Sequence, residues 1–291
     1  NMDELQEKIH EIQNKILAYD NELDKYQINT IPMLQTYEIV KERLIEAEDY
    51  IKDCALDIEK NNTKNALYHL SYGIERYNSA IAWSNFFELT GKELNLDKET
   101  LRESCVQKIA EAEERFQYVQ FYLPYELKNT RDQITKAYTD LNNEDYELCL
   151  FKALKAKAES NVILGALNYN DDNYDSYLET KMNIVRNQIS KQQQKEQFPI
   201  LGYSYYEYAN SLKMGDKYSA LLYLEYALEL SNLDIYFNNN KKMTNFKIDN
   251  GFYKLIMIFI IGAIFGFFSR SLFLKKTSKK NGIHIRIRKR H

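Results

Sequence analysis

The most regular feature of the chain is a pair of apolar heptad patterns near the N-terminus, with spacings that alternate between three and four residues. The first covers Met2, Leu5, Ile9, Ile12, Ile16, Tyr19, Leu23 and Tyr26, and the second covers Tyr37, Val40, Leu44, Ala47, Ile51, Cys54 and Ile58. This spacing places one apolar stripe along each of two helices. Two arrangements fit: a coiled-coil-like antiparallel hairpin over residues 1–60, broken at Ile31-Pro32, or two helices that both face a bundle core.

Helical periodicity continues through most of the chain, which contains only three prolines to interrupt it. We expect further helices over residues 63–90, 98–122, 126–141, 145–166, 173–194, 204–213 and 217–232. The polar stretches 142–146 and 213–218 each precede a helix rich in small apolar residues, which resembles the inner turn of tetratricopeptide repeats. The sequence therefore predicts an all-α fold, with a bundle or weakly tetratricopeptide-like domain over residues 61–232.

The most apolar segment lies near the C-terminus, where residues 255–268 are apolar without interruption. With its flanks, the segment 252–274 would measure about 34 Å as a helix, enough to cross a hydrocarbon core of about 30 Å. We expect a transmembrane helix there, after a juxtamembrane linker over 233–251; the alternative is an apolar helix docked on the soluble part. Gly262 and Gly266 are spaced to let two spans approach closely, although small residues are also common in spans.

Charge is divided sharply between the two parts of the chain. Residues before Gly251 hold all 42 Asp and Glu but 29 of the 39 Lys and Arg, so their net charge is −13, while the remainder carries +10. The basic tail, residues 275–291, comprises Lys275, Lys276, Lys279, Lys280, Arg286, Arg288, Lys289 and Arg290 as its charged residues. The positive-inside rule predicts a cytoplasmic tail and an extracytoplasmic soluble part at the cell membrane. Expected partners are the lipid bilayer, other proteins or a second copy, and no nucleic acid.

Residues able to carry chemistry are scattered. The four histidines form no metal-binding pattern, no phosphate-binding glycine loop is present, and we expect no catalytic site, metal or cofactor. Three cysteines exclude a full disulfide framework, and each falls at an apolar helical position, where a free thiol acts as a small hydrophobe. Asn61 begins an Asn-Asn-Thr triplet that can accept a glycan outside the cell.

Tyrosine is abundant, with 24 residues. One cluster contains Tyr203, Tyr205, Tyr206 and Tyr208, and a second contains Tyr218, Tyr223 and Tyr226. Because a tyrosine ring packs while its hydroxyl stays polar, these clusters could pack helices together or line a binding surface.

The segment Gly73–Phe87 (GIERYNSAIAWSNFF) resembles the helical region of archaeal membrane-anchored Lon-like serine proteases. That family implies a signal and a Ser/Lys protease domain, then a helical region and a C-terminal span. The glycine-rich nucleophile segment and its lysine partner have no counterpart here, so a peptidase domain would have to lie upstream of Asn1, where a signal peptide or a truncation would fit equally well. The chain is then expected to be the non-catalytic, membrane-tethering scaffold. The alternative is a free-standing helical-repeat protein that binds peptides or partner proteins at the membrane.

Overall fold

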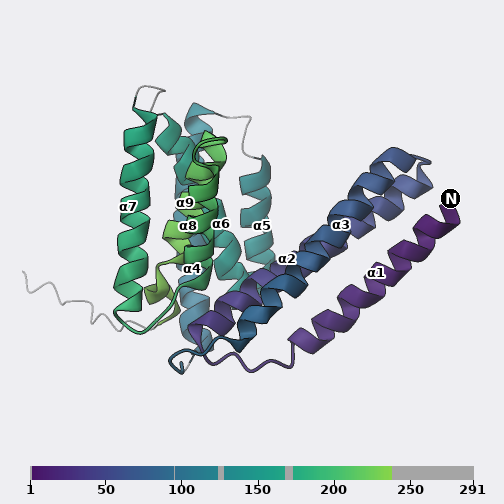
Figure 1. Cartoon of the computed structure of the whole chain (residues 1–291), viewed down its shortest axis with the longest axis horizontal. Helices are drawn as coiled ribbons and strands as arrows, with labels where there is room; N and C mark the ends of the chain where they lie inside the picture. The colour runs from purple at the N-terminus through teal and green to yellow at the C-terminus, as the bar shows by residue number, and fades with distance from the viewer. Residues whose placement is uncertain (1, 95, 124–127, 168–172, 238–291) are drawn as a thin grey trace, which may run out of the picture. The chain divides into compact units, whose positions relative to one another are not determined.

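The described part of the chain is built from helices, and the predicted all-α class is confirmed (Figure 1). The computed structural model describes residues 2–94, 96–123, 128–167 and 173–237. The α-helices are α1 (Met2–Leu23), α2 (Ile31–Glu59), α3 (Thr63–Ser84), α4 (Lys98–Tyr122), α5 (Lys128–Asn142), α6 (Tyr146–Ala166), α7 (Tyr174–Gln193), α8 (Ile200–Leu212) and α9 (Lys217–Leu230). Two short 3-10 helices, η1 (Asn85–Glu88) and η2 (Leu233–Tyr236), complete the set described.

Local chemistry explains where the second helix begins. The hydroxyl of Thr30 accepts a hydrogen bond from the backbone N–H of Met33, and Pro32 occupies the first turn of α2. Proline is tolerated there because the first N–H groups of a helix have no partner inside the helix. The expected break at Ile31-Pro32 is therefore the start of α2.

Most of the predicted heptad residues of α1 and α2 are buried, whereas Tyr26, which follows the end of α1, is 39% exposed. Leu5, Ile9, Ile12, Ile16 and Leu23 of α1 lie in the same apolar cluster as Val40, Leu44, Ala47, Ile51, Cys54 and Ile58 of α2. The two helices run antiparallel, and α3 returns along α2 (Figure 1). The packing of α2 against α3 was not predicted from the sequence. It is more extensive than the packing of α2 against α1.

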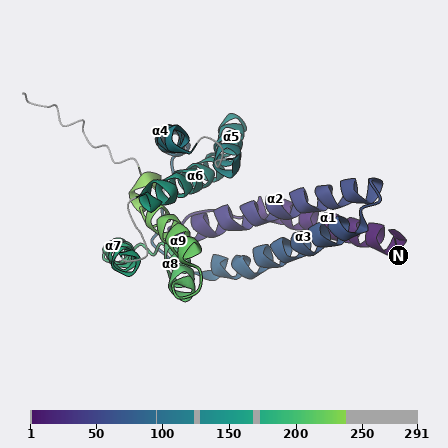
Figure 2. The same cartoon turned by 90° about the horizontal axis from the view of Figure 1, so that it is seen from above.

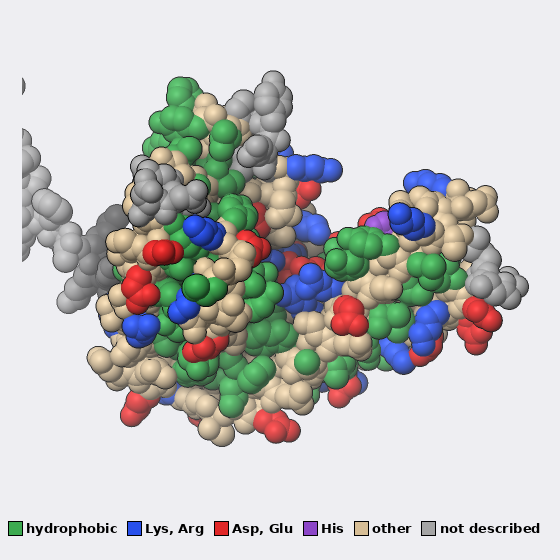
Figure 3. Space-filling view, turned by 45° about the horizontal axis from the view of Figure 1, so that its top comes forward, with side chains coloured by type: hydrophobic (Ala, Val, Ile, Leu, Met, Phe, Trp, Pro, Cys, Tyr) green, Lys and Arg blue, Asp and Glu red, His purple; other side chains and the backbone are tan. Residues whose placement is uncertain are grey.

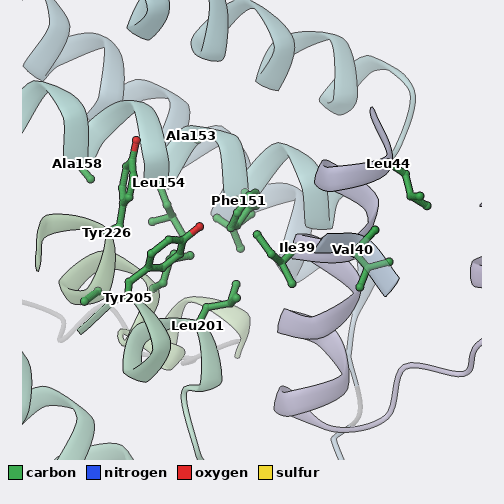
Figure 4. Packing of buried hydrophobic residues seen from close by; sticks show 14 of the residues in the cluster. Ile39, Val40, Leu44, Phe151, Ala153, Leu154, Ala158, Leu201, Tyr205 and Tyr226 are labelled. Atoms are coloured by element: carbon green, nitrogen blue, oxygen red, sulfur yellow. The ribbon is translucent and has the colours of Figure 1, made fainter. Parts of the chain in front are cut away.

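Helix α6 occupies the centre of the remaining helices. It packs against α4, α5, α9 and the first half of α2. Figure 2 shows α4, α5 and α6 on one side and α7, α8 and α9 on the other. Apolar residues of α2, α6, α8 and α9 meet between these groups, and Figure 4 shows Ile39, Phe151, Leu154 and Leu201 there.

Helices α8 and α9 approach each other closely at Gly202. A Cβ atom added at this position would clash with the Ser231 side chain at the end of α9. This packing extends α8 four residues before its predicted start, to Ile200 directly after Pro199.

No helix among the described ranges is long and apolar enough to cross a bilayer. The predicted span over 252–274 falls outside those ranges, as do the 238–251 part of the predicted linker and the basic tail.

Candidate functional site

The most distinctive surface lies where α2 and α3 run beside α8 and α9. We call it the Arg–Tyr junction and define it as Arg43, Glu46, Arg76, Tyr205, Tyr208 and Tyr223. Helices α2 and α8 are in contact, which brings these residues together. Figure 3 shows a hollow between helices α1–α3 and the remaining described helices, with Lys and Arg side chains in it.

Two arginines of the junction share one carboxylate. Arg43 Nη1 lies 2.5 Å from Glu46 Oε2, and Arg76 Nε lies 3.3 Å from the same oxygen. Burial opposes ionisation of Glu46, but the charges of Arg43, Lys155 and Arg76 together hold its pKa below its usual range. The group therefore carries two positive charges and one negative charge at neutral pH.

Three tyrosines of α8 and α9 form the aromatic part of the junction. The Tyr208 and Tyr223 rings meet edge to face with centroids 4.5 Å apart, and Tyr205 stacks on Tyr223 at 5.7 Å. Burial raises the pKa of Tyr223, and the neighbouring Tyr208 and Tyr205 add to this, while Arg43 and Arg76 oppose it. Tyr223 therefore lies within electrostatic range of both arginines.

A buried ionic network supports the floor of the junction. Lys152 Nζ lies 2.7 Å from Asp140 Oδ2 and 3.7 Å from Glu42 Oε2. Lys155 Nζ lies 3.5 Å from the other Glu42 oxygen. These contacts join α2 to α5 and α6 at Glu42, the residue before Arg43, so the network ties α2 to the bundle.

A second buried polar group holds the start of α2 against the end of the described chain. The Tyr236 hydroxyl lies 3.1 Å from both carboxyl oxygens of Glu38. Gln35 donates to the Leu230 carbonyl at 2.8 Å and accepts from the Leu201 N–H at 3.2 Å. Burial raises the pKa of Glu38 well above its usual 4.5, although the hydrogen bond from Tyr236 opposes this. Glu38 is therefore protonated in the folded state at pH values where it is ionised in the unfolded chain.

Replacing Glu38 by glutamine should flatten the dependence of stability on pH. The usual pKa of about 4.5 applies to Glu38 in the unfolded chain, and the pKa in the folded state is well above it. The stabilisation from protonated Glu38 is therefore complete below about pH 4.5 and is lost as the pH rises through the raised pKa of the folded state. Urea unfolding of the wild type should therefore show a larger loss of stability from about pH 5 to about pH 8 than unfolding of Glu38→Gln. Glu48→Gln, an exposed change on the same helix, should keep the wild-type slope. Equal slopes for Glu38→Gln and wild type would contradict this reading.

Among the described residues, no group of three or more His, Cys, Asp or Glu side chains is placed to hold a metal ion. The junction instead offers guanidinium donors next to aromatic rings. Such surfaces recognise carboxylates and apolar side chains on polypeptides.

Of the site residues predicted from the sequence, Asn61 lies within the described ranges. It occupies the turn between α2 and α3, is exposed, and has a left-handed backbone with φ of 56°. Asn62 of the same triplet caps α3 by accepting a hydrogen bond from the Asn65 N–H. Gly262, Gly266 and the basic tail lie outside the described residues.

The interpretation of the cysteines was wrong for two of them. Cys105 of α4 and Cys149 of α6 form a disulfide, and both are fully buried. They lie 44 residues apart, so helical periodicity gives no sign that they meet. Cys54 is a free, fully buried thiol in α2, as expected for a small hydrophobe.

The tyrosine clusters divide between the two interpretations. Tyr205, Tyr206 and Tyr226 are buried packing residues, whereas Tyr203, Tyr208 and Tyr218 are 42–50% exposed.

Sequence reasoning missed Arg43, Glu46 and Arg76. The available signals were the three-residue spacing of Arg43 and Glu46 on the polar side of α2, and the position of Arg76 inside Gly73–Phe87.

Comparisons with protein-family models, with curated proteins and with solved structures found no match to this chain.

Proposed function

We propose that this chain is a membrane-anchored, extracytoplasmic helical scaffold that binds partner proteins at the Arg–Tyr junction. The observation that carries the proposal is the junction itself. Charged and aromatic side chains from four helices converge there, on a floor held by the Glu42–Lys152–Asp140 contacts. Tyrosine and arginine are among the residue types enriched in the strongest contacts of protein interfaces.

Two features support the extracytoplasmic location. A buried disulfide is typical of proteins that fold in an oxidising compartment. The apolar segment 252–274, followed by a tail whose charged residues are all basic, favours a C-terminal anchor with the tail in the cytoplasm. A cytoplasmic tail places residues 1–251 on the outer side.

The resemblance to Lon-like proteases suggests which partner the scaffold serves. Arg76 lies inside Gly73–Phe87, the segment that carries the resemblance. We propose that the scaffold is the non-catalytic C-terminal part of such a protease and presents polypeptides to the peptidase domain near the membrane.

A second candidate is a free-standing helical-repeat protein that binds peptides at the membrane. It is favoured by two helical hairpins of similar design, α5–α6 and α8–α9, which pack against each other through α6 and α9. Asp216 caps α9 at the polar turn by accepting from the Ser219 N–H at 3.0 Å. Both candidates use the same junction.

Site-specific photocrosslinking in cells tests the proposal. A photoreactive phenylalanine analogue at Tyr208 of the full chain should capture discrete protein adducts. The same analogue at Tyr118, which is equally exposed on α4, serves as the matched control. Adducts at Tyr208 alone are expected. A peptidase domain on the same polypeptide as the crosslinked scaffold would favour the protease assignment, and a scaffold without one would favour the free-standing assignment. Equal or absent adducts at the two positions would contradict the proposed binding site.

A further inference from the structure

The junction has one more positive than negative charge. The charged side chains in the junction and in the neighbouring ion pairs are five cations and four carboxylates. The cations are Arg43, Arg76, Lys136, Lys152 and Lys155, and the carboxylates are Glu42, Glu46, Asp49 and Asp140. Lys152 and Lys155 are buried against Glu42 and Asp140, and Lys136 pairs with Asp49 at 3.1 Å. The surplus therefore falls on the two arginines that share Glu46.

The arginine pair still has hydrogen-bond capacity. A guanidinium carries five N–H donors in a planar fork. The contacts of Arg43 and Arg76 with Glu46 use one nitrogen of each side chain, and Arg43 Nε is buried without a hydrogen-bond partner among the described residues. The Arg76 side chain is 34% exposed, so its fork can be reached from solvent. A second carboxylate would complete the pairing.

The surplus is local, because residues 1–250 carry a net charge of −13. At physiological ionic strength the Debye length is about 8 Å, so remote acidic residues are largely screened while a carboxylate inside the junction feels the arginines directly. Tyr208 and Tyr223 supply aromatic surface beside this charge.

We propose that the junction binds a carboxylate side chain within an acidic polypeptide segment. The carboxylate lies between the guanidinium groups of Arg43 and Arg76, and apolar side chains next to it pack on Tyr208 and Tyr223. Arginine suits this role because its fork matches the two oxygens of a carboxylate. This inference rests on the proposed scaffold function and names the chemistry of its partner.

Fluorescence anisotropy with the full chain in detergent micelles tests the inference. The probe is a labelled peptide of alternating acidic residues and leucine, and its matched peptide carries Asn and Gln in place of Asp and Glu. Arg76→Gln should weaken binding of the acidic peptide about tenfold or more, as expected for a lost charge-assisted contact. The control is Arg102→Gln, an exposed arginine paired with Glu99 on α4, which should bind as the wild type does.

A gain of affinity provides a second readout, which a purely structural role for Glu46 would not produce. Glu46→Gln removes the carboxylate that competes with the ligand, so it should tighten binding of the acidic peptide several-fold. Unfolding of each variant is followed by circular dichroism, and Arg76→Gln is expected to fold because Arg76 is partly exposed.

Three results would overturn the inference: equal binding by Arg76→Gln and wild type, equal binding of the acidic and amide peptides, or full competition by inorganic phosphate at a concentration equal to that of the peptide. The last result would indicate a general anion site. If the amide peptide binds and Tyr208→Ala abolishes this binding, the scaffold function stands and the carboxylate assignment fails. If neither peptide binds and crosslinks at Tyr208 are also absent, the proposed function fails with it.

Discussion

Replacing Lys152 by methionine should lower the free energy of unfolding by about 3–5 kcal/mol, the usual cost of breaking a buried ion pair from one side. Lys152 is almost fully buried and contacts both Asp140 and Glu42. Methionine fills similar space, so the loss reports charge rather than a cavity. Among the described residues, loss of Lys152 leaves Asp140 without its ion-pair partner, and Glu42 keeps Lys155, which lies 3.5 Å from its Oε1 atom.

Urea unfolding measures this loss, and two further variants identify its cause. Lys136→Met removes an exposed pair with Asp49 and should change stability by less than about 1 kcal/mol. Adding Asp140→Asn to Lys152→Met removes the stranded carboxylate and should recover most of the loss. If Lys152→Met is no more destabilising than Lys136→Met, the network does not hold α2 in place.

Removal of the Cys105–Cys149 disulfide should lower the free energy of unfolding by about 4 kcal/mol, the chain-entropy value for a closed loop of this length. The bond joins α4 to α6 across 44 residues, and both cysteines are fully buried. The double variant Cys105→Ala/Cys149→Ala, compared with wild type in urea, measures the effect.

Reductant separates the bond from the packing of its sulfur atoms. Dithiothreitol should destabilise the wild type and leave the double variant unchanged. Cys54→Ala is the matched control, because Cys54 is equally buried and has no disulfide partner. It should stay sensitive to reductant. A wild-type unfolding curve that does not move with reductant would show that the bond is absent.

The helices could be predicted from the sequence because their apolar positions recur with helical spacing. The second heptad pattern illustrates this, since six of its seven apolar positions, Val40 to Ile58, are buried on α2 and Tyr37 is partly buried. The start of α8 was missed because Ile200-Leu201-Gly202 contains a glycine, which disfavours a helix by itself. Contact with Ser231 of α9 explains why glycine is accommodated there.

The junction could not be predicted because it depends on contacts between distant parts of the chain. Arg43 and Arg76 meet at Glu46 through the packing of α2 on α3, and Tyr223, which lies within electrostatic range of both, comes from a helix more than a hundred residues later. Heptad spacing specifies which side of each helix is buried. It does not specify which helices become neighbours, and the Cys105–Cys149 bond was missed for the same reason.

The side of the membrane on which the helical part lies is the most direct test of the account. Met214, 91% exposed at the turn between α8 and α9, and Ser278 in the basic tail can each be replaced by cysteine in a Cys54→Ala background of the full chain. Intact cells are then treated with a membrane-impermeant maleimide. The account predicts labelling of Met214→Cys without permeabilisation and of Ser278→Cys only after it. Labelling of Met214→Cys only after permeabilisation would contradict an extracytoplasmic scaffold.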